Sequence, residues 1–324
     1  MFVEQVTYKG WSHCYRLAND EVELIVTSDV GPRIIRFGFI GDDNEFGEFA
    51  EQVGQVGGSE WRIYGGHRLW HSPEDKVRTY YPDNDPVEVI EENGTVRVIQ
   101  PPEVTTGIQK EMAITLEAAN RVEVRHFLRN VGPCPVELAP WALSAMAPGG
   151  MGIAPQPTKA HPDRLLPNRV LVLWPYTDMM DTRIHWGSKF IFLYQDQNVQ
   201  QPTKIGLNVN DGWGASLRQG HLFLKTFEYI EGTNYPDNGC SLEMYTDDRI
   251  LELETLGPLR RPAPGDVVEH VEHWFLFRGV EAGEDEESIE RAVMPLVATA
   301  RSARRLFTTG HFSGEAGAGI LSGA

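Results

Sequence analysis

The stretch KEMAITLEAANRVEVRHFLRN, residues 110–130, decides the fold class of this chain. Apolar side chains recur at every second position in its first half, 110–116, and through most of its second half, 121–130. A period of two puts alternate side chains on one face of a β-strand, so each half predicts a strand with one buried face. The short connection at Ala119-Asn120 predicts a turn, and the whole stretch predicts an antiparallel hairpin.

The same pattern recurs along most of the chain. We expect further strands at 21–27, 33–40, 87–90, 95–99, 190–194, 222–227, 241–246, 250–255 and 269–277. The second of the predicted hairpins, 87–99, has an Asn-Gly turn at its tip. No helices alternate with these strands, which argues against a parallel sheet and for an all-β fold, a large antiparallel sandwich with few short helices.

The length of 324 residues fits one large β domain with a short extension. We expect residues 1–280 to form that single domain, 281–305 to form a C-terminal helical segment, and 306–324 to be a flexible, Gly-rich tail. Within the helical segment, 285–298 has Ile289, Val293 and Leu296 on one face. Pro295 should kink or end this helix.

Composition and net charge limit the classes of partner that the protein can bind. The chain is 41% hydrophobic, enough for a sizeable core, and Lys+Arg 29 against Asp+Glu 46 gives a net charge of −17. No basic run compensates for this charge, so we expect a small neutral molecule rather than nucleic acid or an anionic membrane. No apolar run approaches the roughly 18 residues of a membrane span.

The three cysteines, Cys14, Cys134 and Cys240, are widely spaced and odd in number. This spacing predicts neither a disulfide framework nor a zinc ribbon, and it favours a reducing compartment. The start of the chain has no basic segment followed by an apolar one, so we expect the protein to be cytoplasmic.

The stretch GGHRLWHSPED, residues 65–75, combines His67, Arg68, Trp70, His71 and Glu74 beside a glycine pair. We expect a ligand-binding loop in which the glycines let the backbone approach the ligand closely. Three interpretations stay open at this point: a metal site, one wall of a sugar site with acid and base groups, and a structural turn whose histidines bind loop carbonyls.

A metal site would use His67, His71 and Glu74, since two imidazoles and a carboxylate form a familiar ligand set. The spacing H-x-x-x-H puts both histidines on one face only in a helix, and the flanking glycines and Pro73 disfavour a helix here. We therefore expect no metal and no cofactor, and keep a metal-assisted lyase or hydrolase as the third hypothesis.

Glu252 and Glu254 lie two residues apart in a run of leucines and so project from the same face of one predicted strand. Two carboxylates close together among apolar neighbours raise at least one pKa, which suits a general acid or base near neutral pH. The alternative is a solvated face of a half-buried strand, and alternation alone favours that alternative.

Residues 241–277 resemble the carboxyl-terminal part of the aldose 1-epimerase (galactose mutarotase-like) superfamily. In that family a strand ending Leu-Glu-Thr carries the catalytic Glu, which corresponds to Glu254 in 253–255 here, and 264–266, Pro-Gly-Asp, resembles the turn before its last strand. Tyr64 to His67 and Trp70 resemble the loop that walls its sugar site. Tyr64 itself stands where hexose mutarotases have a His, and 140–143 stands where they carry their second, acid-bearing His.

The chain up to about residue 280 also resembles an uncharacterised branch of that superfamily, the domain of unknown function DUF4380. The matching segments are 66–70, 235–239 and 251–258. This resemblance implies a β-supersandwich fold and a carbohydrate ligand.

Our first hypothesis is therefore an aldose 1-epimerase-like isomerase that interconverts sugar anomers. Glu254 would deprotonate the anomeric hydroxyl, and His67 or His71, helped by Arg68, would protonate the ring oxygen. A second hypothesis is a carbohydrate-binding protein without catalysis. The groups expected to bind the sugar are Arg68, Trp70, Glu74, Trp141, Lys204, Trp213, Lys225, Tyr235, Asp237 and Glu252.

Overall fold

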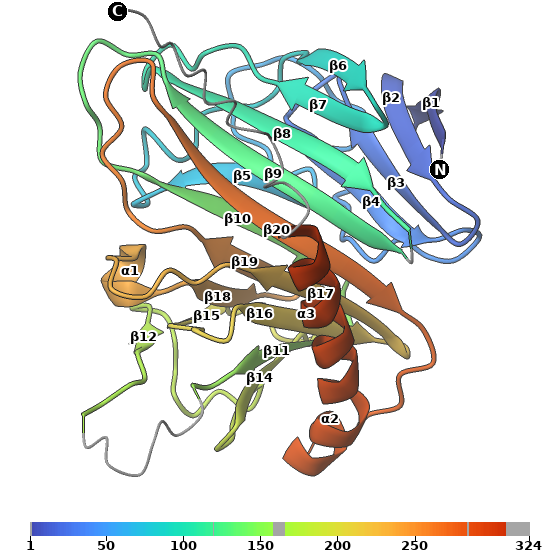
Figure 1. Ribbon diagram of the computed structural model, residues 1–324, viewed down its shortest axis with the longest axis vertical. Helices are drawn as coiled ribbons and strands as arrows, with labels where there is room; N and C mark the ends of the chain where they lie inside the picture. The colour runs from blue at the N-terminus through green and yellow to red at the C-terminus, as the bar shows by residue number, and fades with distance from the viewer. Residues whose placement is uncertain (1, 119, 158–165, 284, 309–324) are drawn as a thin grey trace, which may run out of the picture. The chain divides into compact units, whose positions relative to one another are not determined.

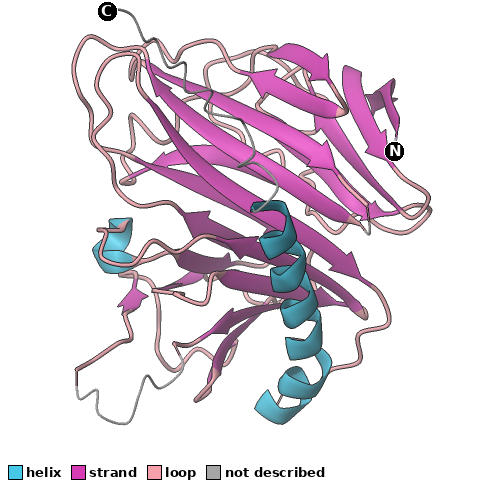
Figure 2. Ribbon diagram, viewed as in Figure 1, coloured by secondary structure: helices cyan, strands magenta, loops and turns pink. Residues whose placement is uncertain are grey.

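The computed structural model describes residues 2–118, 120–157, 166–283 and 285–308. The chain divides into two compact units, Met1–Glu281 and Ala282–Ala324. The first unit holds two large antiparallel sheets, which confirms the predicted all-β class (Figures 1 and 2). The predicted tail, 306–324, lies almost wholly outside the described residues.

Sheet 1 has ten strands among the described residues, and at its centre the neighbouring strands β5, β10 and β19 are far apart in sequence. Its strands in spatial order are β1 Phe2–Tyr8, β2 Trp11–Ala18, β3 Val22–Thr27, β4 Arg33–Phe39, β5 Gly66–Ser72, β10 Ala139–Met146, β19 Leu251–Leu256, β18 Leu242–Thr246, β15 Thr203–Leu207 and β12 Leu171–Leu173. Strands β5, β10 and β19 pair in this order at its centre, so only β10 separates the 65–75 stretch from the strand of Glu254.

Sheet 2 also has ten strands in the described part of the chain. They are β13 Ile184–Trp186, β14 Phe190–Tyr194, β11 Met151–Pro155, β16 Trp213–Arg218, β17 His221–Phe227, β20 Val267–Phe277, β9 Arg121–Asn130, β8 Ile108–Leu116, β7 Thr95–Ile99 and β6 Glu88–Glu92. Strands β8 and β9 form the hairpin predicted from residues 110–130. The β6–β7 hairpin turns at Asn93 and Gly94, which both have positive φ, as its Asn-Gly tip predicts.

The hydrophobic core lies between the two sheets. Phe37 of sheet 1 contacts Phe223 and Trp274 of sheet 2, with ring centroids 6.0 Å apart in both pairs. These side chains belong to one buried cluster that draws on strands from both sheets. Alternation along each strand thus buries one face against the other sheet, as in other β-sandwiches.

The predicted loop at 65–75 is wrong for most of its length, because residues 66–72 form the fully buried strand β5. Its glycines admit neighbouring backbone rather than a ligand. A Cβ on Gly65 would lie 2.0 Å from the carbonyl oxygen of Gly47, and one on Gly66 would lie 2.3 Å from that of Ile34. Both also have positive φ, so only glycine fits this crossing of chains.

Three helices occur among the described residues. The first, α1 Pro236–Gly239, is a single turn in which Asp237 has a positive φ of 49°. The predicted C-terminal helix is two helices, α2 Glu286–Ala292 and α3 Met294–Thr308, which separate just before Pro295. None of the described helices is long and apolar enough to cross a membrane.

Candidate functional site on the front face of sheet 1

A row of side chains crosses the centre of sheet 1. In the strand register, Arg68 of β5 is opposite Leu143 of β10, Leu143 is opposite Glu254 of β19, and Glu254 is opposite Glu243 of β18. Residues opposite one another point to the same side of a sheet. We call this side, which also carries Trp141 and Lys204, the front face.

The other side of the same strands, the back face, packs against sheet 2. It carries His67 and His71, because they alternate with Arg68 and Trp70 along β5. The structure therefore does not bring either histidine together with Glu254, although all three were predicted to share one site. The strand assignment of β5 accounts for this separation.

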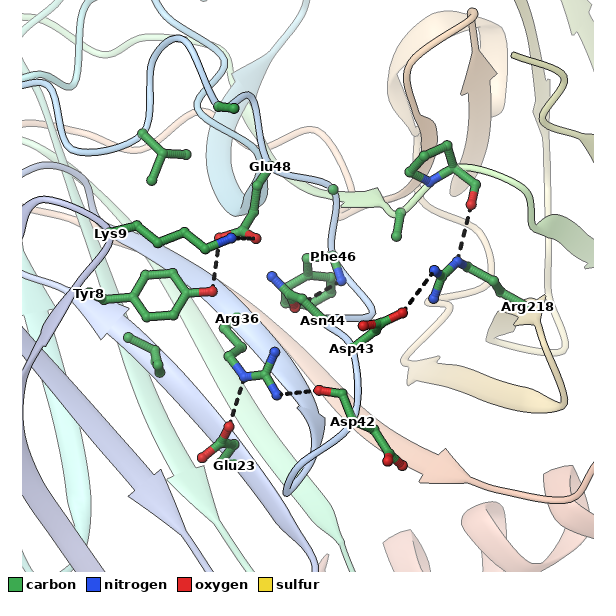
Figure 3. A pocket seen from close by; sticks show the side chains of 16 residues that line it. Tyr8, Lys9, Glu23, Arg36, Asp42, Asp43, Asn44, Phe46, Glu48 and Arg218 are labelled. Carbon is green, nitrogen blue, oxygen red and sulfur yellow. Dashed lines mark hydrogen bonds and ion pairs between the residues drawn. The ribbon is translucent and has the colours of Figure 1, made fainter.

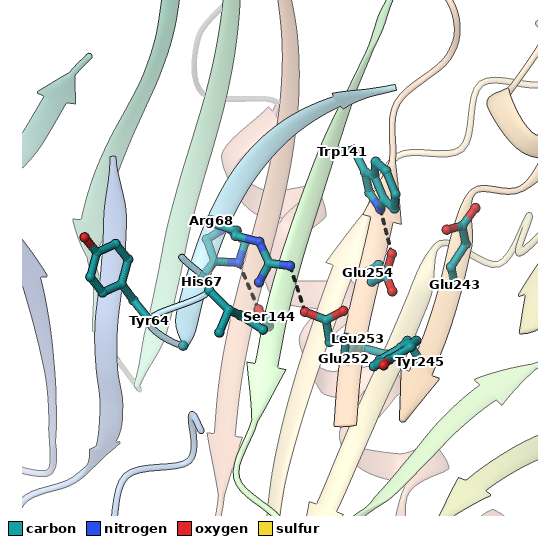
Figure 4. A network of polar contacts seen from close by, with 12 residues as sticks. Tyr64, His67, Arg68, Trp141, Ser144, Glu243, Tyr245, Glu252, Leu253 and Glu254 are labelled. Carbon is teal, nitrogen blue, oxygen red and sulfur yellow. Dashed lines mark hydrogen bonds and ion pairs between the residues drawn. The ribbon is translucent and has the colours of Figure 1, made fainter. Parts of the chain in front are cut away.

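Glu254 lies at the centre of the front face and is fully buried. Its Oε2 accepts hydrogen bonds from Trp141 Nε1 at 2.7 Å (Figure 4) and from Lys204 Nζ at 2.9 Å. Its other oxygen, Oε1, has no hydrogen-bond partner among the described residues. One oxygen of this carboxylate is thus held in place, while the other is buried without a hydrogen-bond partner among the described residues.

Lys204 joins two carboxylates on the front face. Its Nζ lies 2.8 Å from Glu243 Oε2 as well as 2.9 Å from Glu254 Oε2. The ammonium is 4.6 Å from the ring centre of Trp141 and 4.7 Å from that of Trp174. Burial alone would lower the pKa of Lys204, but the two carboxylates outweigh burial and hold this pKa well above its usual value.

Trp174 can reach this position because β15 has a glycine beneath it. A Cβ on Gly206 would lie 3.2 Å from the Trp174 ring and 2.5 Å from Cys240 Sγ. Any larger residue would push the indole away from Lys204.

Glu252 and Arg68 form the second ion pair of the front face. Arg68 Nη2 donates to Glu252 Oε1 at 2.9 Å, and the guanidinium lies 4.6 Å from the ring centre of Trp70 (Figure 4). Burial raises the pKa of Glu252, although Arg68 opposes this effect. Glu252 and Glu254 share one face, as predicted, and both are buried rather than solvated. Two Arg68 donors, Nε and Nη1, are buried with no partner among the described residues.

Three further groups surround the row. Glu74 accepts a hydrogen bond of 2.6 Å from Tyr80, whose ring contacts Trp70. Burial raises the pKa of Tyr176 to about 12, and this group is also influenced by the charges of Lys204 and Glu254. Burial raises the pKa of Asp237, and the charges of Lys204 and Glu254 also influence it.

On the back face, His67 and His126 face each other with their Nε2 atoms 2.7 Å apart. His126 Nδ1 lies 3.0 Å from the carbonyl oxygen of His270, which can only accept, so His126 carries its hydrogen on Nδ1. His67 must then donate from Nε2, and its Nδ1 accepts from the Ser144 hydroxyl at 2.9 Å. Burial and the nearby Lys225 ammonium keep the pKa of His67 well below its usual value, so both rings are neutral.

An ion pair completes this back-face group. Lys225 Nζ lies 2.9 Å from Glu272 Oε1 and donates to the carbonyl of Leu253 at 3.1 Å. Thr255 and Trp274 also donate to the Glu272 carboxylate, at 2.5 and 2.7 Å. The two residues that flank Glu254 in β19 are thereby tied to sheet 2.

The predicted metal ligands do not converge. His71 pairs with Glu103 at 3.4 Å, while Glu74 is bonded to Tyr80 and His67 to His126. His67 does lie near another ligand set, with His126 and Glu272, whose ligand atoms are within 4.8 Å of one another. An ion there would have to replace the hydrogen bond between the two imidazoles.

Two predicted sugar-binding residues, Trp213 and Lys225, lie away from the front face, and a third, Tyr235, has its hydroxyl and ring engaged by neighbouring residues. Trp213 is buried in sheet 2 beside Phe190, with ring centroids 6.1 Å apart. Lys225 belongs to the back-face group. The Tyr235 hydroxyl accepts from the backbone N–H of Ile230 at 2.8 Å, and its ring stacks on Tyr229.

A hollow of about 800 Å³ lies elsewhere on the first unit, lined by residues from β1, β3, β4 and the loops that follow (Figure 3). Its charged groups are occupied with one another. Lys9 and the Tyr8 hydroxyl bind Glu48 at 2.6 and 2.9 Å, and Arg36 binds Glu23 at 2.8 Å. Among the described residues, buried polar side-chain atoms without a hydrogen-bond partner occur on the front face and not in the lining of this hollow.

Three solved structures share this fold. The Slr1438 protein from Synechocystis sp. PCC 6803 aligns over 86% of this chain and 98% of its own, with a TM-score of 0.56 and 11% identity. A candidate aldose 1-epimerase from Klebsiella pneumoniae aligns over 91% and 87%, with a TM-score of 0.54 and 11% identity. A galactose mutarotase-like protein from Lactobacillus casei aligns over 82% and 100%, with a TM-score of 0.51 and 8% identity.

The chain therefore has the fold of galactose mutarotase-like proteins, as the resemblance in its sequence predicts. No protein-family model matches the sequence, and a search among curated proteins finds no similar one. The more specific resemblance to the DUF4380 branch stays a prediction.

Sequence reasoning missed Glu243 as a site residue. Its strand, 241–246, was predicted, and Glu243 alternates with Leu242 and Met244 just as Glu254 alternates with its leucines. The available signal was a charged residue that stands between two apolar residues inside a predicted strand. The pairing with Glu254 could not be read from it, because that depends on the register of β18 and β19.

Proposed function

We propose that this protein catalyses acid and base conversion of a sugar, interconverting anomers, on the front face of sheet 1. One observation carries the proposal: Glu254 is fully buried, two donors hold its Oε2, and Oε1 has no partner among the described residues. Buried polar atoms without partners are rare in folded proteins, so such an atom is a candidate contact for an ordered water or a bound molecule.

Glu254 is the proposed base that removes the proton of the anomeric hydroxyl. The Trp141 N–H and the Lys204 ammonium stabilise its negative charge through Oε2, which leaves Oε1 to take the proton. A carboxylate fixed in this way loses little freedom on reaching the reactive arrangement, which favours a fast proton transfer.

The groups around Glu254 fit a neutral sugar. The indoles of Trp70, Trp141 and Trp174 offer apolar surface for the C–H face of a pyranose ring. The unpartnered Nε and Nη1 of Arg68 are donors for its hydroxyls. These features support a carbohydrate and do not identify which one.

The test is NMR exchange spectroscopy on a panel of aldoses, with and without the protein. We expect the wild type to accelerate anomer exchange of at least one sugar and Glu254→Gln to lose about 100-fold or more of that acceleration. Equal rates in the variant and the wild type would refute the role of Glu254.

The second candidate function is carbohydrate binding without catalysis, favoured by the absence of a histidine beside Glu254 on the front face among the described residues. Calorimetric titration with the same panel distinguishes the two. A sugar that binds the wild type but exchanges no faster in its presence would favour the binding protein.

A further inference from the structure

Glu243 is the group on the front face whose surroundings differ most from those of Glu254. The two carboxyls stand directly opposite each other on β18 and β19, both fully buried, and both contact the single Lys204 ammonium. Glu254 also receives the Trp141 N–H. Among the described residues, no N–H or hydroxyl other than that ammonium donates to Glu243.

The charges in this group do not balance if every carboxyl is ionised. One ammonium serves Glu243 and Glu254, and Asp237 approaches Glu243 as well, while Arg68 is already paired with Glu252. Carboxylates this close in a buried place cannot all be charged, so the group holds at least one proton.

Each neighbour bears on where that proton resides. Glu243 is faced by Lys204 from β15, Glu254 from β19, Asp237 and Cys240 from the α1 turn, and more distantly Tyr176. Burial raises the pKa of Glu243 well above its usual value, and the charges of Glu254 and Asp237 add to this while Lys204 opposes it. Lys204 keeps its own proton because its pKa is raised. Glu243 has fewer donors than Glu254, which favours Glu243 over Glu254 as the carboxyl that holds the shared proton.

We infer that Glu243 is the catalytic acid that complements Glu254, and that Lys204 is the positioning residue that holds the two carboxyls on either side of one ammonium. This inference rests on the proposed function, since it assigns the second group of the same reaction. It puts a carboxylic acid where the sequence analysis expected His67 or His71.

The reaction balances with these two groups alone. Glu254 takes the proton of the anomeric hydroxyl while Glu243 gives its proton to the ring oxygen. The bond between the anomeric carbon and the ring oxygen breaks, and the electron pair of the broken O–H bond forms the C=O bond of the open-chain aldehyde. Rotation about the adjacent C–C bond and the reverse steps close the other anomer and return both protons. The two oxygens involved are bonded to one carbon, so acid and base must lie close together, as Glu243 and Glu254 do.

The first experiment measures protonation and needs no substrate. With glutamate labelled at its side-chain carboxyl carbon, NMR at pH 7 should show a protonated carboxyl that disappears in Glu243→Gln. Glutamine is nearly isosteric with the neutral acid, so the variant should fold, which thermal unfolding checks. Glu23→Gln is the control, because Arg16 and Arg36 hold the pKa of Glu23 below its usual value against the effect of burial, and it should remove no protonated signal. If no protonated signal is lost in Glu243→Gln, the inference is overturned.

The second experiment measures the pH profile of anomer exchange. The wild-type rate should fall at high pH as Glu243 loses its proton, and Glu243→Gln should be about 100-fold slower and lack this alkaline fall. An unchanged alkaline fall in the variant would overturn the acid role. If the wild type accelerates no sugar, the proposed function fails, and the catalytic role with it, while a protonated Glu243 in the NMR experiment would still stand.

Discussion

The two faces of the same central strands, β5, β10, β19 and β18, carry polar groups of opposite character. On the back face, the polar atoms of the His67, His126 and Ser144 chain and of the Lys225–Glu272 ion pair all have partners, whereas Nδ1 of His71 is buried without one among the described residues. On the front face, buried atoms of Arg68, Glu243 and Glu254 lack hydrogen-bond partners among the described residues.

Under the proposed function, this difference assigns stability to the back face and catalysis to the front face. A satisfied network in a dry core fixes the strands and has no capacity left for a ligand. A network with buried, unsatisfied atoms is costly unless a bound molecule completes it. Two contacts connect the two faces. Lys225 donates to the backbone carbonyl of Leu253, and the Thr255 hydroxyl donates to Glu272. Both contacts hold β19 from its back face, while Glu254 projects from its front face.

The largest expected effect on stability belongs to the back face. Lys225→Met should lower the free energy of unfolding by about 3–5 kcal/mol, because it leaves the fully buried Glu272 carboxylate without its cation. Urea unfolding followed by fluorescence measures this. Adding Glu272→Gln to the same variant removes the unpaired charge and should restore part of the loss. A single variant as stable as the wild type would show that the back-face ion pair does not carry the fold.

The pH dependence of stability should also report the back face. Burial lowers the pKa of His126 from 6.5 to about 4, so the unfolded chain binds this proton more tightly than the folded one. Stability is therefore complete above pH 6.5 and falls as the pH drops towards 4, by up to about 3 kcal/mol. His126→Asn should flatten this part of the curve of unfolding free energy against pH. A variant curve parallel to that of the wild type would assign the loss to other groups.

The sequence predicts the fold more completely than it predicts the candidate site. Period-two alternation in residues 110–130 and in the other strands predicted the sandwich, because it depends only on which side chains are buried. Residues 66–72 show no such alternation of apolar and polar side chains, and the paired glycines and Pro73 suggested a loop there. Since β5 was not recognised as a strand, His67 and His71 were placed with Glu254 when they belong to the opposite face.

Other parts of the site depend on contacts that local patterns do not encode. The prediction that Glu252 and Glu254 share one face was correct, because both lie on one strand two residues apart. Glu243 joins them only through the register of β18, and Trp174 only through the space above Gly206. Strand order and register are set by the whole sheet, so one sequence read locally predicts the strands but not which of their side chains meet.

A smaller effect should follow from the donor to Glu254. Trp141→Phe removes the N–H bonded to Oε2 but keeps an aromatic ring, and it should slow anomer exchange about 10-fold, a cost of about 1.4 kcal/mol. Trp213→Phe is the matched control, since Trp213 is equally buried but lies in sheet 2, and it should leave the rate unchanged. If the control slowed exchange as much as Trp141→Phe, the front face would not be where the sugar binds.

The most direct test of the whole account measures anomer exchange and unfolding free energy on the same preparations of wild type, Glu254→Gln and Lys225→Met. We predict that Glu254→Gln loses about 100-fold or more of the exchange rate while its unfolding free energy changes by no more than about 1 kcal/mol. Lys225→Met should show the large loss of stability. A Glu254→Gln protein that exchanges anomers as fast as the wild type would contradict the central claim that the front face is the catalytic one.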